Sequence, residues 1–169
     1  MRRDVMKDLK YIPAVTALAI IFSFMFLLPA CSKPRSVSDV PLTANGLKSE
    51  ISVASPPVSL KPNSTISIKV KIKNAGSAVW PGDGKSGGKY PINLAYHWLD
   101  KGGKILILDG MRTALPYNLK PGEDVTVDAK VAVPLPPGQY ILEFDIVQEL
   151  VAWFGDKGNK TARLNVTVE

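Results

Sequence analysis

Apolar and polar residues alternate with a period of two along several stretches of the chain, and this pattern predicts β-strands. The clearest stretch runs from Ile66 to Ile72, where isoleucine and valine alternate with serine and lysine. Because successive side chains of a strand point to opposite faces, one face of this strand is expected to be buried and the other solvated. The same alternation is found from Val125 to Val133, from Tyr140 to Ile146 and from Leu164 to Val168; shorter candidate strands are Ile51 to Ala54, Ile92 to Leu99 and Ile105 to Leu108.

Turn-forming residues separate these stretches. They occur in the strings Asn74-Ala75-Gly76, Lys101-Gly102-Gly103, Lys120-Pro121-Gly122 and Pro136-Pro137-Gly138. No stretch beyond residue 30 carries a convincing helical period. Seven short strands with turns between them predict an all-β fold, a seven-stranded antiparallel β-sandwich.

Three features indicate that the predicted sandwich is immunoglobulin-like. Trp98 lies on the third predicted strand, where this fold packs a large ring at its centre, and Pro137-Gly138-Gln139-Tyr140 resembles the approach to a tyrosine corner. Leu142 stands where antibody domains carry their second cysteine. Because the chain has a single cysteine, no internal disulfide can form, and apolar packing must supply the stability.

The N-terminal part of the chain has a different pattern. An apolar run from residue 12 to residue 29 follows a leader with four basic residues, Arg2, Arg3, Lys7 and Lys10. A basic leader, an apolar stretch and a small residue at the cleavage position are typical of a signal peptide. The string Leu28-Pro29-Ala30-Cys31 resembles a bacterial lipobox.

That resemblance implies that residues 1–30 are a cleaved lipoprotein signal helix and that Cys31 becomes acylated. Two or more acyl chains give stable anchoring, whereas one gives only marginal membrane residence. The protein is then expected in the cell envelope, facing outside the cytoplasm, and Ser32 in place of Asp favours the outer membrane of a Gram-negative cell. The alternative is an uncleaved transmembrane segment, because the run lies at the short edge of the length that spans a bilayer.

The rest of the chain divides into a tether and one domain. Residues 31–49 are rich in serine, proline, lysine and small residues without a sustained period, which predicts a flexible tether. Residues 50–169 hold the predicted strands and form one Ig-like domain of ordinary size. After cleavage 17 basic and 13 acidic residues remain, a net charge of +4. Without a block of lysine and arginine, nucleic acid is not an expected partner.

A more specific resemblance covers about residues 60–169. It rests on the strings Asn74-Ala75-Gly76, Val79-Trp80-Pro81, Tyr96-His97-Trp98-Leu99-Asp100, Arg112-Thr113-Ala114-Leu115-Pro116 and Val151-Ala152-Trp153-Phe154. These resemble an Ig-like accessory module appended to bacterial glycosyltransferases, methyltransferases and other surface-polysaccharide proteins. A weaker similarity, on Asn74, Gly76 and Trp80, is to the protein-binding Ig-like domain of selective autophagy receptors. The resemblance implies no defined activity of the module itself.

One end of the predicted sandwich gathers candidate binding residues. The loop between strands two and three, the segment 110–116 and the loop before the last strand are expected at the same end, and they carry Trp80, Tyr90, Arg112, Trp153 and Phe154. Aromatic rings stack on sugars or anchor protein interfaces, and an arginine fork pairs with a carboxylate or phosphate. The alternative is structural, because such rings also plug the open end of a sandwich core.

Catalysis has little support in the sequence. His97 is the only histidine, so a multi-histidine metal site is excluded, and its place beside Trp98 favours a surface or packing role. Asp145 and Glu149 lie about 13 Å apart along a predicted strand, longer than a glycosidase pair, and are expected to be solvated charges or salt-bridge partners. No Gly-x-Ser-x-Gly motif or cofactor fingerprint is present. We therefore expect no enzyme activity, no cofactor and no metal.

Two functions from different classes fit these features. The first is a non-catalytic, lipid-anchored envelope protein that binds surface polysaccharide or a partner protein through the aromatic end. The second is a purely structural component of an envelope assembly, which docks a partner by strand addition at a sheet edge. An envelope glycan-processing enzyme is a third and weaker alternative.

Overall fold

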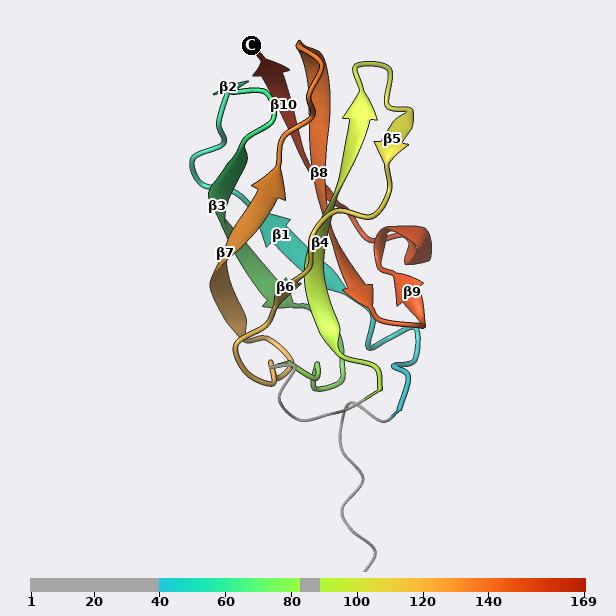
Figure 1. Ribbon diagram of the computed structural model, residues 1–169. Helices are drawn as coiled ribbons and strands as arrows, with labels where there is room; N and C mark the ends of the chain where they lie inside the picture. The colour runs from blue at the N-terminus through green and yellow to red at the C-terminus, as the bar shows by residue number, and fades with distance from the viewer. Residues whose placement is uncertain (1–39, 83–88) are drawn as a thin grey trace, which may run out of the picture. The chain divides into compact units, whose positions relative to one another are not determined.

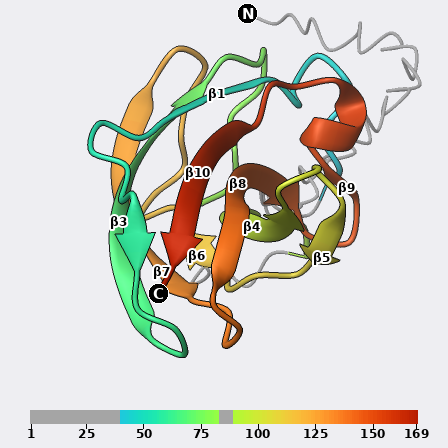
Figure 2. The ribbon, with the colours of Figure 1, turned by 90° about the horizontal axis from the view of Figure 1, so that it is seen from above.

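The computed structural model describes residues 40–82 and 89–169, which form two β-sheets packed face to face (Figures 1 and 2). The smaller sheet has the order β1–β3–β7, with bounds Ser49–Ser52, Thr65–Asn74 and Asp124–Ala132. The larger sheet has the order β2–β10–β8–β4–β5, with bounds Ser59–Leu60, Ala162–Val168, Gly138–Gln148, Ile92–Asp100 and Ile105–Ile107. Two short strands add to it: β6 (Thr113–Ala114) pairs with β4, and β9 (Ala152–Trp153) pairs with β8.

The strand order is that of an Ig-like β-sandwich. In chain order, β1, β3 and β7 match the first, second and fifth strands of that fold, and β4, β8 and β10 match its opposite sheet. The pairings are antiparallel except between β2 and β10, which run in parallel. The predicted all-β, antiparallel, Ig-like architecture is therefore confirmed.

Strands β3 and β7 follow the predicted period of two. Ile68, Val70 and Ile72 of β3 are buried, and the lysines between them point to solvent, where they pair with carboxylates of neighbouring strands. The Lys69 Nζ to Asp128 Oδ1 distance is 3.0 Å. Exposed pairs of this kind contribute little stability, so the buried face of β3 is what holds this strand on the core.

The residues expected from an Ig-like core occupy their predicted places. Trp98 is fully buried, and its indole N–H donates to the Ala132 carbonyl at 2.9 Å. The Tyr140 hydroxyl donates to the Pro136 carbonyl four residues upstream at 2.8 Å, which is the bond of a tyrosine corner. Leu142 is fully buried opposite Trp98, so apolar packing replaces the disulfide of antibody domains.

The folded domain begins earlier than its composition predicts. Leu47 is buried in the core, Leu42 packs against it, and the Trp80 indole N–H donates to the Gly46 carbonyl at 2.8 Å. Residues 42–49, expected to be tether, therefore belong to the domain. Their small polar residues form a turn that brings two leucines to the core, a pattern without sequence periodicity.

The leader, Cys31 and the predicted tether up to residue 39 lie outside the described residues. Within residues 40–82 and 89–169 there is no helix with the length and apolar character that a bilayer crossing requires.

Strands β4 and β8 are buried on both faces, which the period of two does not predict. Leu94, Tyr96 and Trp98 of β4 face the core, while His97 and Leu99 lie on the outer face and are buried as well. The chain from β9 through the short 3₁₀ turn η2 (Gly155–Lys157) folds over this outer face (Figure 1). The cover creates the polar site described next.

Candidate functional site

The structure separates the five predicted binding residues into three groups. Trp80 and Phe154 are both fully buried, and their rings meet edge to face with centroids 5.2 Å apart. Rings in this geometry supply core area and packing energy. The structural interpretation is therefore correct for Trp80 and Phe154, which close one end of the core.

Tyr90 forms the second group. It is half-buried at the end of the sandwich where β8 finishes, and its carbonyl accepts a hydrogen bond from the Gln148 side chain at 3.2 Å. The Lys89 ammonium lies 5.2 Å from the centre of its ring. No contact joins Tyr90 to Trp153 or Arg112 among the described contacts, so these residues do not form one cluster with it.

Arg112 and Trp153 form the third group. The Arg112 guanidinium carbon lies 4.8 Å from the centre of the Trp153 ring, which is a cation–π arrangement. Its nitrogens donate to Glu149 Oε1 at 2.9 Å, Asp109 Oδ1 at 2.8 Å and the Gly110 carbonyl at 3.0 Å. Burial by itself lowers the pKa of Arg112, but the bonds to Asp109 and Glu149 raise it above its ordinary value. Glu149 thus takes the second of the two roles expected for it, that of a salt-bridge partner.

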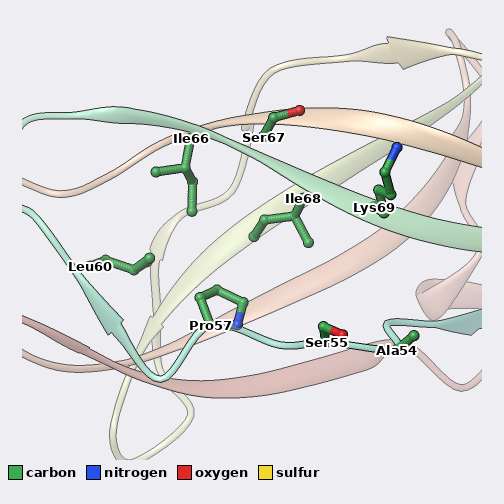
Figure 3. Close-up of a pocket in the computed structure, with 8 residues that line it drawn as sticks. All are labelled: Ala54, Ser55, Pro57, Leu60, Ile66, Ser67, Ile68 and Lys69. Carbon is green, nitrogen blue, oxygen red and sulfur yellow. The ribbon is translucent and has the colours of Figure 1, made fainter.

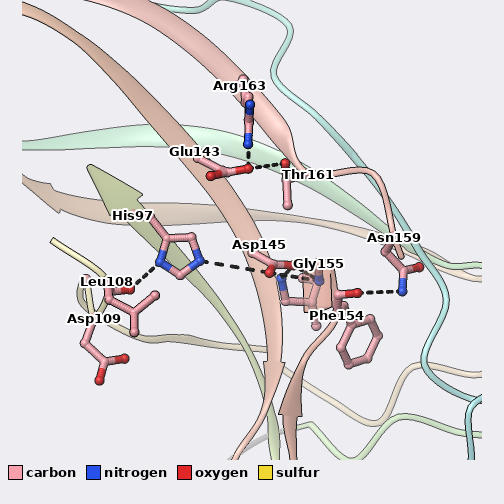
Figure 4. A network of polar contacts seen from close by, with 12 residues as sticks. His97, Leu108, Asp109, Glu143, Asp145, Phe154, Gly155, Asn159, Thr161 and Arg163 are labelled. Carbon is pink, nitrogen blue, oxygen red and sulfur yellow. Dashed lines mark hydrogen bonds and ion pairs between the residues drawn. The ribbon is translucent and has the colours of Figure 1, made fainter. Parts of the chain in front are cut away.

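A polar pocket of about 420 Å³ lies beside this pair, on the outer face of β4 and β8. Figure 4 shows the polar contacts among several of its residues. The pocket floor carries three buried ionisable side chains, His97, Glu143 and Asp145. The remaining lining residues are Ile105, Leu108, Trp153, Gly155, Asp156, Asn159, Thr161 and Arg163. Converging polar groups in a concave site, one of them with a shifted pKa, are the usual marks of a binding site.

His97 is held in this pocket from two sides. Its Nδ1 bonds to the Leu108 carbonyl, and its Nε2 lies 4.0 Å from Asp145 Oδ2. The Trp153 ring closes the third side, with ring centroids 4.4 Å apart at 64°. Burial lowers the pKa of His97, but Asp145, the Leu108 carbonyl and, more weakly, Glu143 outweigh it, so the pKa is raised above 6.5. The imidazole is therefore buried, with its Nε2 edge facing the Asp145 carboxylate.

Asp145 is buried and faces His97, so of the two roles expected for it, a solvated charge or a salt-bridge partner, the first is wrong. Its Oδ1 accepts from the Ile146 N–H at 2.7 Å, and its Oδ2 accepts from the Gly155 N–H at 3.0 Å. A Cβ at position 155 would come within 2.7 Å of Asp145 Oδ2, so only glycine allows this approach. Asp145 therefore fixes the η2 turn over the outer face of the sheet.

Glu143 and Asn159 hold the rest of the cover. Glu143 Oε1 accepts from Arg163 Nε at 2.9 Å and from the Thr161 hydroxyl (Figure 4). Asn159 Nδ2 donates to the Phe154 carbonyl at 2.9 Å and to the Leu47 carbonyl at 2.7 Å. Each side chain ties the segment after β9 to a different part of the domain, so the pocket walls are well supported.

The sequence pattern gives no direct sign of four further lining residues, Glu143, Asn159, Thr161 and Arg163. Glu143 and Asp145 alternate with core residues of β8, and His97 lies directly opposite Glu143 on β4. The sequence feature that could have indicated the site is the placing of Glu143 and Asp145 across from the single histidine. This can be recognised only once the register of β4 and β8 is known.

The pocket lining combines several kinds of polar group with an aromatic ring. It includes the Trp153 ring, two carboxylates on its floor and amide and hydroxyl groups. In the described part of the chain, no three histidine, cysteine, aspartate or glutamate side chains gather as a metal site.

A second hollow of about 420 Å³ lies between β3 and the segment that joins β1 to β2 (Figure 3). Its lining is mostly apolar, with Pro57, Leu60, Ile66 and Ile68 among its residues. It lacks the converging polar groups of the pocket at His97, so we place the candidate site at the polar pocket.

The strand order, Trp98 and the tyrosine corner define the chain as an Ig-like β-sandwich domain. No family model and no curated protein matches it. Among solved structures it is similar to a β-glucosidase from Listeria innocua in complex with glucose, at 14% identity and a TM-score of 0.45, over 71% of this chain and 16% of that one. It is also similar to the CARDB domain of the PF1109 protein from Pyrococcus furiosus in complex with di-metal ions, at 17% identity and a TM-score of 0.42, over 72% and 86%. A third is the β-glucosidase EmGH1 from Erythrobacter marinus, at 12% identity and a TM-score of 0.41, over 72% and 16%.

This chain thus spans only about a sixth of the length of the glucosidase chains that it matches.

Proposed function

We propose that this protein is a non-catalytic, lipid-anchored protein of the cell envelope that binds a surface polysaccharide in the polar pocket beside Trp153. The observation that carries the binding part is the pocket floor, where His97, Glu143 and Asp145 are buried together under a half-buried tryptophan. The anchor is supported by the basic leader, the apolar run and the string Leu28-Pro29-Ala30-Cys31.

The arrangement of His97 and Asp145 favours a hydroxyl-rich ligand. Because the Leu108 carbonyl only accepts, Nδ1 of His97 donates to it, and Nε2 of the neutral ring is left as an acceptor. It then faces a second acceptor, Asp145 Oδ2, across 4.0 Å. A proton on Nε2 satisfies this pair; on the neutral ring each of the two acceptors needs a donor of its own, because a hydroxyl carries a single hydrogen. Two neighbouring sugar hydroxyls can supply these donors.

The charges of the pocket favour a neutral sugar over an acidic one. Arg112 already donates to Glu149, Asp109 and a carbonyl, and Arg163 donates to Glu143. An acidic ligand therefore finds these arginines already paired with carboxylates of the protein. The sequence predicts that an arginine pairs with a ligand carboxylate or phosphate, whereas here the arginines pair within the protein. We therefore expect the ligand to be recognised by hydrogen bonds and by stacking on the Trp153 ring.

A glycan array tests this proposal with the acylated mature chain in detergent. We expect Trp153→Ala and Arg112→Ala to weaken binding by about tenfold or more, because Trp153 forms the pocket wall and Arg112 holds its ring. Tyr117→Ala is the matched control, since Tyr117 is an exposed aromatic residue outside the pocket lining. Absent glycan binding, or binding unchanged by both pocket variants, contradicts the proposal.

One observation favours the structural alternative. The edge strand β5 and the residue after it expose four consecutive apolar side chains, Ile105, Leu106, Ile107 and Leu108. An exposed apolar sheet edge is a surface on which a partner strand docks. An assembly component of the envelope would use this edge, and Leu106→Lys would then abolish partner binding while the pocket variants leave it intact.

A further inference from the structure

The turn between β8 and β9 exposes a bulky apolar residue in an unfavourable backbone conformation. Leu150 has a φ of 61° and is 80% exposed, and Val151 beside it is 37% exposed. The left-handed region suits glycine or asparagine and is costly for a bulky side chain. The leucine adds no core packing in return for this strain.

A buried glutamine gathers three chain segments around this turn. The Gln148 side chain is fully buried, accepts from the Leu42 N–H at 2.9 Å and donates to the Tyr90 carbonyl at 3.2 Å. The Glu149 N–H donates to the Pro91 carbonyl at 3.0 Å. The first described residues, the Lys89–Tyr90 pair and the Leu150 turn therefore lie at the same end of the sandwich. We call Val40, Lys89, Tyr90, Leu150 and Val151 the tether-end surface.

The length of chain between the lipid site and this end limits their separation. Cys31 is nine residues from Val40, and a fully extended chain spans at most about 3.6 Å per residue, or about 32 Å in total. An acylated Cys31 therefore keeps this end of the domain near the membrane. Figure 1 shows the C-terminal end of the sandwich at the opposite end from the β8–β9 turn.

We propose that the tether-end surface rests in the interfacial layer of the lipid bilayer, with Leu150 and Val151 inserted among the acyl chains. This inference rests on the proposed lipid anchor. Tyrosine and lysine suit the headgroup level, where the ring is half in water and the ammonium meets phosphate. The surface thus combines apolar, amphipathic and cationic groups at the end that the lipid tether holds, and it fixes the orientation of the pocket relative to the membrane.

Quenching by brominated lipids tests this contact. The full acylated chain is reconstituted into phosphatidylcholine–phosphatidylglycerol vesicles with brominated acyl chains, and tryptophan is introduced by Leu150→Trp. Leu135→Trp is the matched control, because Leu135 is also an exposed leucine but precedes the opposite end of β8. We expect quenching of the added tryptophan to be at least about twofold stronger at position 150 than at position 135, since a ring at the interface lies beside the bromines.

Flotation of the same vesicles separates the two proposals. A chain that floats with the vesicles through Cys31 but is quenched equally at positions 150 and 135 overturns the membrane contact and leaves the anchor intact. A chain that does not float contradicts the anchor and, with it, the membrane contact. Stronger quenching at position 150 in a floating chain supports both.

Discussion

His97 has more polar contacts than core packing alone would require. Its ring is enclosed by the Leu108 carbonyl, Trp153 and two carboxylates of β8, Asp145 and Glu143. Burial opposes the imidazolium form, and the acceptors around the ring favour it more strongly, so the pKa of His97 is raised. The folded domain therefore binds a proton here more tightly than the unfolded chain does.

This linkage predicts a pH-dependent stability. Below about pH 6.5 His97 is protonated in both states, so the stabilisation is complete; it is lost as the pH rises through the raised pKa of the folded state. We expect the free energy of unfolding, measured by urea titration, to be lower at about pH 9 than at about pH 6. His97→Gln should flatten the profile over this range. A wild-type profile that is flat, or that rises with pH, contradicts the pairing.

The sequence could not predict which side chains on the outer face of the larger sheet are buried. Asp145 and Glu143 sit at positions that a period of two assigns to solvent, and the assignment is wrong because the segment after β9 covers them. Arg112 and Trp153 were predicted to lie together and do, whereas Trp80 and Phe154 serve the core. An aromatic residue in a loop looks the same in sequence whether it faces inward or outward.

At the scale of elements, the hairpin and turn from β8 to β10 shape both proposed surfaces. One side forms the wall of the polar pocket through Trp153 and Gly155, and its tip carries Leu150. Phe154 packs this segment onto the core against Trp80. Hydrogen bonds that involve the side chains of Gln148, Asp145 and Asn159 fix the rest of it. Its position therefore depends on one core ring and a few buried polar side chains.

Gln148 offers the clearest test of that dependence. Gln148→Ala leaves the Leu42 N–H and the Tyr90 carbonyl without their partner, and we expect the free energy of unfolding to fall by about 1–3 kcal/mol. Gln139→Ala, at an exposed position of the same strand, should change it by less than about 0.5 kcal/mol. Urea unfolding of the two variants side by side gives the comparison. Equal losses would show that Gln148 does not clamp this end.

The long strands were predictable because alternation and turn residues agree along them. β3 and β7 coincide with stretches of strict period two, and β8 follows the Pro136-Pro137-Gly138 turn. The short strands β2, β6 and β9 were not predicted, because two residues carry no period and form only against a neighbouring strand.

At the scale of the whole molecule, the sandwich presents different surfaces at its two ends and on its outer face. The first described residues join the end near Gln148, the outer face of the larger sheet holds the polar pocket, and Leu135 precedes the other end of β8. The alternation of apolar and polar residues predicted the class of fold, but the polar composition of residues 31–49 placed the start of the domain too late, since two leucines in a polar segment give no pattern. The proposed arrangement is a binding module held close to a lipid surface.

Metabolic labelling of the producing cells with an alkyne analogue of palmitate tests the central claim most directly. The wild-type chain is compared with Cys31→Ser, which removes the only thiol in the sequence. The account predicts a labelled, shortened wild-type protein in the membrane fraction and an unlabelled, unprocessed variant. An unlabelled wild-type protein, or a Cys31→Ser variant that matures and localises unchanged, would contradict it.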